Sequence, residues 1–359
     1  MKSKFSFAAI AAFVAAFTLQ PQQANAKIWR VNNNLIYIAG DTPGTLCDHC
    51  YDNLQTAVDD VFNVQNGDTI HVEASLTPYT GKGAYGEVII IRHLVLLGPG
   101  YFLDYNPGLQ HNPIAATITN IRLDIGSKGT ILKGLRIAED FYSFIYINDD
   151  NVTVERCYVE DNIDFINTTP RVLNNVSIKQ CYVAGILDNP TYPGPINNLV
   201  VMNNYFGSVA KLANNYQGVF AHNVTNNGVN GYGGMVYYNN IIKSGTFTQN
   251  NNSVTNVYKN IFYNKPAWLD VPFPTNFFNV VIANVFATTG SIDGRLDPLP
   301  TCTDCPNGAN NHEIGMFGGN DPYRLSGVPD IPAIYFLRPE VNLIQGGNLP
   351  ITIKTRTNN

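Results

Sequence analysis

The sequence predicts an all-β fold, a right-handed parallel β-helix, from three observations. Seven short apolar segments, and a degenerate one at Leu135 ahead of them, lie between residues 130 and 288. Each carries a marker residue with an apolar residue three positions earlier and, in most, another two positions later. Val, Ile, Tyr and Phe are common in these segments, and no helical stripe runs through them. The markers recur every 17 to 24 residues, at Leu135, Cys157, Cys181, Asn204, Asn223, Asn240, Asn260 and Asn284.

Each segment suits a strand of about 3 to 5 residues that bends near its marker. A unit this short cannot bury its apolar residues alone, so successive units must stack, with equivalent residues about 4.8 Å apart along the axis. Asparagine suits the bend because it tolerates left-handed backbone, and its amide can bond to the amide above or below. A leucine-rich or helical solenoid is the competing interpretation, which the strand-like composition disfavours.

Residues 1–26 predict an export signal. Two lysines precede an apolar run over residues 5–19, and Ala24-Asn25-Ala26 provides a small-x-small cleavage site. The mature chain is then expected to begin at Lys27 and to be secreted, periplasmic or held at the cell surface. The apolar run is too short for a transmembrane segment, and none is predicted later in the chain.

Residues 27–101 predict an N-terminal cap and the first turns, and residues 102–290 the main β-helix. A helix is expected over 53–62, followed by a strand that begins at the sequence Gly-Asp-Thr-Ile. An amphipathic helix here would cover the apolar core of the first turn. Its apolar face is expected to consist of Leu54, Ala57, Val58, Val61 and Phe62.

The order of elements in this opening is specific. The short helix and the Gly-Asp-Thr-Ile strand are followed by an extended loop over 79–87 and two apolar strands over 88–91 and 94–97 that end in Gly-Pro-Gly. This order resembles the opening of exported bacterial β-helix proteins of the pectate-lyase-like superfamily. The resemblance extends over most of the mature chain and implies the parallel β-helix architecture. It implies polysaccharide cleavage only where the catalytic residues of that superfamily are matched.

Those catalytic residues are incompletely matched. Polygalacturonases of this fold carry Gly-His-Gly and Arg-Ile-Lys motifs, and neither occurs in this chain. Asp149-Asp150 supplies a carboxylate pair, but its position between two segments favours a solvated turn. We therefore expect a non-catalytic extracellular binding or structural protein with glycans as its ligands. The alternative is a polysaccharide lyase or glycoside hydrolase of the same superfamily.

Residues 291–359 predict a linker and a tail packed on the solenoid. The run over 297–306 is rich in proline, and a Gly-Gly pair and further spaced prolines follow it. An extended segment along the outside of the solenoid is therefore expected, with a short strand pairing near 349–354.

The chain contains six cysteines, and four of them form two Cys-x-x-Cys pairs, Cys47 with Cys50 and Cys302 with Cys305. In an exported protein these pairs favour local disulfides over a zinc site. Cys157 and Cys181 occupy the same marker position one turn apart. Their spacing is compatible with a disulfide, but parallel side chains fit two stacked free thiols equally well.

A column of carboxylates is predicted on two neighbouring turns, at Glu139, Asp140, Glu160 and Asp161. Like charges about 5 Å apart repel, and a Ca²⁺ ion held by their oxygens would relieve that repulsion. The alternative is a solvated acidic turn. No cofactor is required, and Ca²⁺ is the ion that this column suggests.

Tyr158, Tyr182 and Tyr205 each stand one residue before an inward position, so we expect them to point outward in a stack. Aligned tyrosines can bind the faces of sugars, or they can stabilise a parallel sheet by stacking on each other. These three residues are the candidate ligand-binding positions.

Composition limits the classes of partner. Only 14% of the residues are charged and the formal net charge is −5, which gives no basic footprint for nucleic acid. A polar surface of amides and hydroxyls suits a polysaccharide or a cell-surface glycan. Four arginines are each able to bind a uronate carboxylate, namely Arg122, Arg136, Arg156 and Arg171. We expect the protein to be a monomer.

Overall fold

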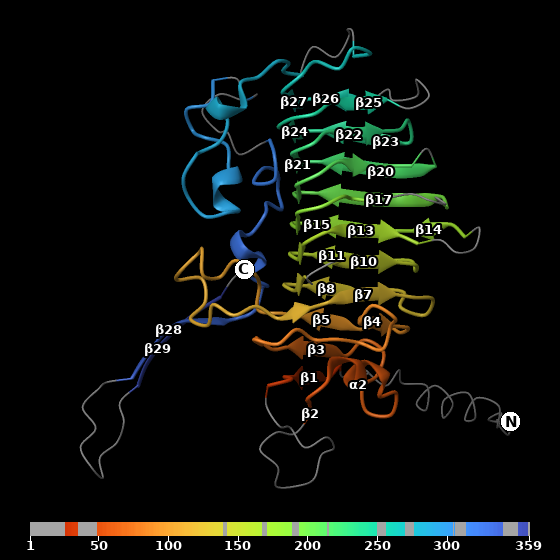
Figure 1. The fold of residues 1–359 in the computed structure, drawn as a ribbon, viewed down its shortest axis with the longest axis vertical. Helices are drawn as coiled ribbons and strands as arrows, with labels where there is room; N and C mark the ends of the chain where they lie inside the picture. The colour runs from red at the N-terminus through yellow and green to blue at the C-terminus, as the bar shows by residue number, and fades with distance from the viewer. Residues whose placement is uncertain are drawn as a thin grey trace, which may run out of the picture.

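In the computed structural model the chain winds into a mostly β, parallel β-solenoid of about nine turns (Figure 1). The predicted fold class is confirmed, and the right-handed winding stays a prediction. The structure describes residues 26–34, 49–138, 142–166, 171–188, 194–213, 215–249, 256–269, 276–303, 305, 314–339 and 351–357. The predicted signal peptide lies almost wholly outside these residues.

Three columns of parallel strands form the faces of the solenoid, and we call them sheets 1, 2 and 3. Sheet 1 contains, in spatial order, β2 (Cys50–Tyr51), β1 (Ile28–Val31), β3 (Thr69–Val72), β5 (Val95–Leu97), β8 (Ile131–Lys133), β11 (Thr153–Glu155), β15 (Ser177–Lys179), β17 (Ile196–Met202), β20 (Tyr216–Ala221), β23 (Met235–Tyr238) and β26 (Val257–Tyr258), with β14 (Leu173–Asn174) beside β17.

Sheets 2 and 3 complete each turn. Sheet 2 contains β6 (Thr117–Ile118), β9 (Arg136–Ile137), β12 (Tyr158–Val159), β16 (Tyr182–Val183), β18 (Tyr205–Phe206), β21 (Val224–Thr225), β24 (Ile241–Ile242) and β27 (Ile261–Phe262). Sheet 3 contains β4 (Glu87–Ile90), β7 (Asn120–Leu123), β10 (Phe144–Ile147) and β13 (Asn162–Phe165), then β19 (Ala210–Lys211), β22 (Val229–Gly231) and β25 (Phe247–Gln249). Bridges through Leu187 join its two parts.

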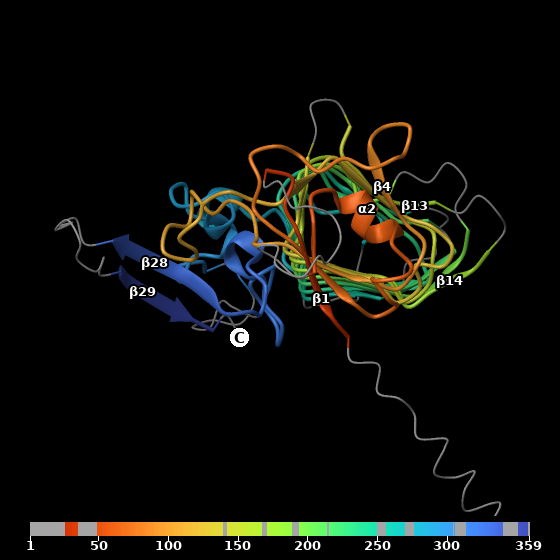
Figure 2. The ribbon, with the colours of Figure 1, turned by 90° about the horizontal axis from the view of Figure 1, so that it is seen from below.

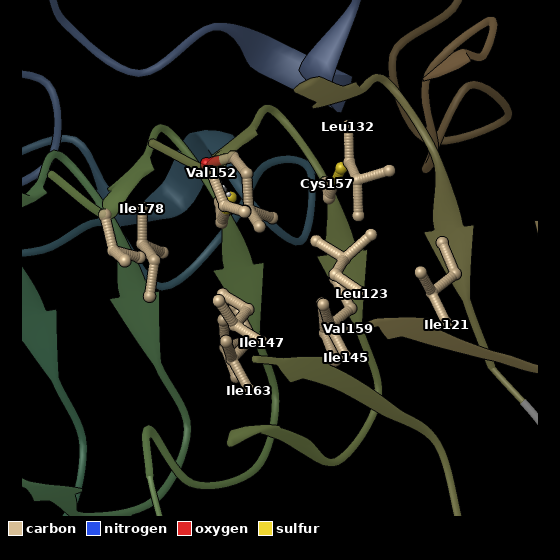
Figure 3. Packing of buried hydrophobic residues seen from close by; sticks show 14 of the residues in the cluster. Ile121, Leu123, Leu132, Ile145, Ile147, Val152, Cys157, Val159, Ile163 and Ile178 are labelled. Carbon is tan, nitrogen blue, oxygen red and sulfur yellow. Dashed lines mark hydrogen bonds between the residues drawn. The ribbon is translucent and has the colours of Figure 1, made fainter. Parts of the chain in front are cut away.

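The core is the stack of inward side chains from successive turns. The residues predicted three positions before each marker pair in register along sheet 1 from Leu132 to Val257 and are at most 1% exposed. In sheet 3, Ile121, Ile145 and Ile163 stack in the same way (Figure 3). Alternation along each short strand thus places one apolar residue inside and its neighbours outside.

The marker position points into the core. Leu135, Cys157 and Cys181 occupy it in the first turns and are fully buried, and the two cysteines are free thiols. The buried asparagines that follow bond amide to amide, with Asn204 Nδ2 donating to Asn223 Oδ1 at 3.0 Å. The chain of bonds continues through Asn240, Asn260 and Asn276.

The bend and the amide bonds were both predicted at the marker, but in the structure they belong to two successive residues. The left-handed backbone lies one residue earlier, with φ between 52° and 58° at Arg156, Gln180, Asn203, His222 and Asn239. Each turn therefore bends at the preceding residue, while the marker side chain is left to fill the core.

The prediction that Asn284 is the last marker was wrong. Asn276 continues the column of amides, accepting from Asn260 N at 2.9 Å. Asn284 instead lies in the 3₁₀ helix η1 (Ile282–Asn284), and Val281, expected to be inward, is 56% exposed. The final turn is shorter than the preceding spacing suggested.

The capping helix is also shorter than predicted. Helix α2 (Leu54–Asp59) begins at Asn53, whose side chain accepts from Thr56 N, and it buries Leu54, Ala57 and Val58 as expected. It covers the N-terminal end of the solenoid (Figure 2). Because the helix ends at Asp59, Val61 and Phe62 are not on its buried face, and Phe62 is 90% exposed.

The described residues from 281 onward lie outside the three sheets of the solenoid. They include η1, η2 (Gly294–Leu296) and η4 (Leu325–Gly327). They end in an antiparallel hairpin of β28 (Ala333–Pro339) and β29 (Ile351–Arg356), which extends away from the solenoid (Figure 1). The predicted strand pairing near the C-terminus is therefore present.

Candidate functional site

The predicted tyrosine stack is present on the outward side of sheet 2. The rings of Tyr158 and Tyr182 lie 5.8 Å apart between centroids, and those of Tyr182 and Tyr205 lie 4.5 Å apart. Phe102 meets both Tyr158 and Tyr182 edge-on at 5.1 Å. Tyr182 and Tyr205 are only 9% exposed, however, so the stack does not offer an open surface to a glycan.

The residues that cover this stack come from the C-terminal part of the chain. We call the described residues within 280–330 the cover segment. Together with the outward residues of sheet 2 it forms a second apolar cluster, separate from the solenoid core. Its contributions are Val280, Val285, Phe286, Leu296, Cys302, Cys305, Ile314, Met316 and Tyr323.

The left-handed bend residues hold the cover segment in place. Asn203 Nδ2 donates to Met316 O at 3.0 Å, and Gln180 Nε2 donates to Asp321 O at 3.0 Å. Arg156 Nη1 donates to Val328 O at 3.1 Å and forms an ion pair with Asp330. These side chains point outward at the corner between sheets 1 and 2, and the signal in the sequence was a polar residue before each marker.

We expect the attachment of the cover segment to depend on pH through Asp330. Burial alone would raise the pKa of its carboxyl, but hydrogen bonds from Lys133 and Arg156 lower the pKa below its ordinary value. A carboxylate of this kind contributes stability above its ordinary pKa of about 3.9 and loses it as the pH falls through the lowered value.

We expect amide protection in the cover segment to fall several-fold between pH 7 and pH 3, before the solenoid core opens. Hydrogen exchange read separately for residues 314–330 and for sheet 1 measures this. Asp330→Asn should already show the weaker protection at pH 7 and little further change on acidification. Equal pH dependence in parent and variant would show that the attachment does not depend on this carboxylate.

The other predicted positions are only partly described. Glu139, Asp140 and Cys47 lie outside the described residues. Glu160 is half-buried, and Asp161 Oδ2 accepts from Ser143 N at 2.7 Å. Among the residues that the structure describes, no three His, Cys, Asp or Glu side chains lie close enough to hold a metal ion. The Ca²⁺ expectation therefore stays a prediction.

The structure describes five of the six cysteines. Cys302 and Cys305 form the predicted disulfide, with their Cα atoms 5.5 Å apart. Cys50 is also disulfide-bonded. Burial raises the pKa of Cys157 to about 12, so this thiol stays protonated and unreactive at neutral pH. Of the two interpretations of the stacked pair, the structure supports free thiols.

The four candidate arginines divide into three that serve the fold and one on an open surface. Arg156 holds the cover segment, Arg171 forms an ion pair with Asp149, and Arg136 lies over the Tyr158 ring. Arg122 lies on the outward side of β7, and its side chain is 37% exposed. Its Nε donates to Asp124 Oδ1 at 2.9 Å, which fixes the guanidinium above sheet 3.

Sheet 3 presents this open surface over β4, β7, β10 and β13. The register places Ile89, Arg122, Tyr146 and Asp164 in one outward column. Tyr146 and Phe144 pack against each other with their ring centroids 3.9 Å apart. We call this face, with Tyr85 and Tyr142 at its edge, the sheet 3 face.

Two exposed tyrosines flank the strands of this face. Tyr85 precedes β4 and is 69% exposed, and Tyr142 precedes β10 and is 71% exposed. Each stands two residues before its strand, and β7 lies between the two strands. The backbones of the two tyrosines are thus two turns apart, or about 10 Å.

Asn120 fixes the backbone beside both tyrosines. This fully buried residue donates from Nδ2 to Tyr85 O at 2.8 Å and accepts at Oδ1 from Phe144 N at 2.9 Å. One side chain on β7 therefore connects the segment before β4 to the start of β10. Asn120 was not predicted as a site residue, because one asparagine among many gives no distinct signal in the sequence.

The electrostatics of the sheet 3 face keep Tyr146 neutral. Burial raises the pKa of its phenol, the carboxylates of Asp164 and Glu87 raise it further, and Arg122 lowers it. The hydroxyl is therefore protonated at neutral pH and able to donate a hydrogen bond. A guanidinium, a carboxylate and a phenol thus lie together among aromatic rings.

The carboxylates of Glu87 and Asp164 are far apart on this face. Glu87 is 5% exposed and accepts from Tyr85 N at 2.7 Å, whereas Asp164 belongs to β13. Three turns, about 14 Å, separate their backbones. Glycoside hydrolysis uses carboxyl groups about 5 to 9.5 Å apart, a shorter separation than that between Glu87 and Asp164.

Comparison with known proteins gives no family for the chain. No family model, no curated protein and no solved structure matches it. Within the described part of the chain, no helix is long and apolar enough to cross a membrane.

Proposed function

We propose that the protein is an extracellular, non-catalytic glycan-binding β-solenoid whose sheet 3 face holds the glycan. The observation that carries the proposal is the pair of exposed tyrosines, Tyr85 and Tyr142, beside the column of Arg122, Tyr146 and Asp164. A rigid parallel sheet supports all five residues. Such a face has fixed spacing, so little ordering is required of it on binding.

The chemistry of the face suits a chain of sugars. The negative face of a tyrosine ring attracts the C–H groups of a pyranose, and two rings about 10 Å apart can contact two units of one chain. The Tyr146 hydroxyl and the Asp164 carboxylate are a donor and an acceptor for sugar hydroxyls. Arg122 adds a site for a uronate carboxylate, so we propose that acidic polysaccharides bind better than neutral ones.

Export supports the same proposal. The N-terminal segment has the features of a signal peptide, and the chain contains the Cys302–Cys305 disulfide, which is typical of oxidising compartments. A glycan at a cell surface or in a matrix would be available to a protein exported in this way.

Binding to a panel of neutral and acidic polysaccharides tests the proposal. The Tyr85→Ala, Tyr142→Ala double variant should bind the preferred polysaccharide about tenfold more weakly, because two aromatic contacts of about 0.5 to 1.5 kcal/mol are lost. Arg122→Gln should weaken the binding of acidic polysaccharides more than that of neutral ones. Tyr105→Ala, Tyr263→Ala is the matched control, since those rings are 53% and 46% exposed elsewhere on the surface.

Three outcomes would contradict the proposal. These are unchanged affinity in the double variant, an equal loss in the control, or no binding to any polysaccharide. Release of unsaturated or reducing ends during incubation would identify the polysaccharide lyase or hydrolase alternative instead.

A further inference from the structure

A separate cavity of about 320 Å³ lies between sheet 1, the loop after β5 and the base of the C-terminal hairpin. It is remote in the fold from the sheet 3 face, because its walls belong to β3, to residues 99–112 and to residues 328–337. Most of the lining is apolar. Its principal side chains are those of His71, Pro99, His111, Pro329, Pro332 and Leu337.

Backbone hydrogen bonds fix the walls of this cavity. His111 N donates to Ile334 O at 2.7 Å, and Tyr101 N donates to Ser326 O at 2.8 Å. The Arg356 side chain on β29 donates from Nη2 to Leu109 O at 3.0 Å. The loop is thus held to the hairpin at two points and to η4 at a third, so the cavity is a formed feature of the fold.

His71 supplies the polar group of the cavity. It lies on the outward side of β3, and its ring has no hydrogen-bond partner among the described residues. Burial lowers the pKa of this imidazole, Glu73 raises it by a smaller amount and Arg30 lowers it, so the ring is neutral at pH 7. A neutral imidazole offers one donor and one acceptor to a ligand.

A second polar group of the cavity, in the loop after β5, also lacks a hydrogen-bond partner among the described residues. The side-chain oxygen of Gln110 is buried without a hydrogen-bond partner in the described structure. A buried acceptor without a partner costs about 1 to 3 kcal/mol. The Gln110 oxygen therefore adds an unpaired acceptor beside the proline and aliphatic surfaces of the cavity.

We propose that this cavity binds a small neutral aromatic molecule that carries a hydroxyl group. Proline rings and aliphatic side chains pack well against a flat apolar ring, and the volume lies within the range of small-molecule sites. We propose His71 as the acceptor of that hydroxyl, because its neutral imidazole lines the cavity and is half-buried. A charged ligand is disfavoured because the walls offer no opposite charge.

The probe pair 2-naphthol and naphthalene tests this proposal, since the two differ only in the hydroxyl. We expect saturable binding of 2-naphthol, measured by its fluorescence, and binding of naphthalene about tenfold weaker, because one net hydrogen bond contributes about 1.4 kcal/mol. His71→Phe should remove that preference by weakening the binding of 2-naphthol about tenfold. It should leave naphthalene binding and the melting temperature unchanged.

His93→Phe is the matched control, because His93 is also half-buried but does not line the cavity. It should alter the binding of neither probe. The proposal is wrong if neither probe saturates at its solubility limit, if both bind equally, or if His71→Phe keeps the parent's preference for 2-naphthol.

Discussion

Val201→Asp is expected to leave the protein unable to fold. Val201 is fully buried between Ile178 and Phe220 in the inward column of sheet 1. A carboxylate at this position would lose its hydration with no cation to pair with, and it would interrupt the stacking of both neighbouring turns. The expected cost exceeds about 5 kcal/mol, which is comparable with the whole stability of an ordinary domain.

Val200→Asp is the matched control, because Val200 is the adjacent residue of β17 and lies on the outward side of the same sheet. The same chemical change should lower the free energy of unfolding by no more than about 1 kcal/mol there. Circular dichroism and thermal unfolding of both variants give the comparison. A Val201→Asp protein that melts within a few degrees of the parent would contradict the inward assignment.

Asn240→Leu is expected to destabilise the solenoid by about 2 to 4 kcal/mol, since it leaves buried polar groups without partners. Asn240 Oδ1 accepts from Asn223 N at 2.9 Å, and its Nδ2 donates to Phe220 O at 2.9 Å and to Asn260 Oδ1 at 2.9 Å. Leucine has a similar volume but replaces none of these bonds. Denaturant unfolding measures the change.

The control for this variant is Asn197→Leu. Asn197 is half-buried, and its amide donates to Asn174 Oδ1 at 3.2 Å near the surface, where water can replace that bond. Asn197→Leu should lower the free energy of unfolding by less than about 1 kcal/mol. Similar losses in the two variants would mean that the buried amides of the marker column are not a main source of stability.

The sequence predicted the core residues well because the same inward pattern recurs in every turn of a stacked fold. Val154, Ile178 and Val201 stand at equal offsets from their markers, so each turn confirms the assignment of the next. The prediction failed where the repeat ends, at Asn284, because the last turn is shorter. It also assigned the bend to the marker itself, since a one-dimensional pattern does not separate left-handed backbone from an inward side chain.

The candidate site was less accessible to sequence reasoning. The outward direction of Tyr182 followed from its offset, but its burial depends on residues such as Met316 and Tyr323, which are more than a hundred positions away and follow no repeat. Arg122 was among four candidate arginines, and only the register of β7 shows that it lies on an open face. Tyr85 and Tyr142 precede strands two turns apart, and their alignment required the strand pairing.

Hydroxyl-radical footprinting of tyrosines, with and without the best-binding polysaccharide, tests the proposed use of the sheet 3 face most directly. We predict that Tyr85 and Tyr142 lose most of their reactivity when the polysaccharide binds. Tyr105 and Tyr263, which are exposed elsewhere, should keep theirs. Protection of Tyr105 or Tyr263 with Tyr85 and Tyr142 unchanged would place the glycan elsewhere on the solenoid and contradict the proposed function of this face.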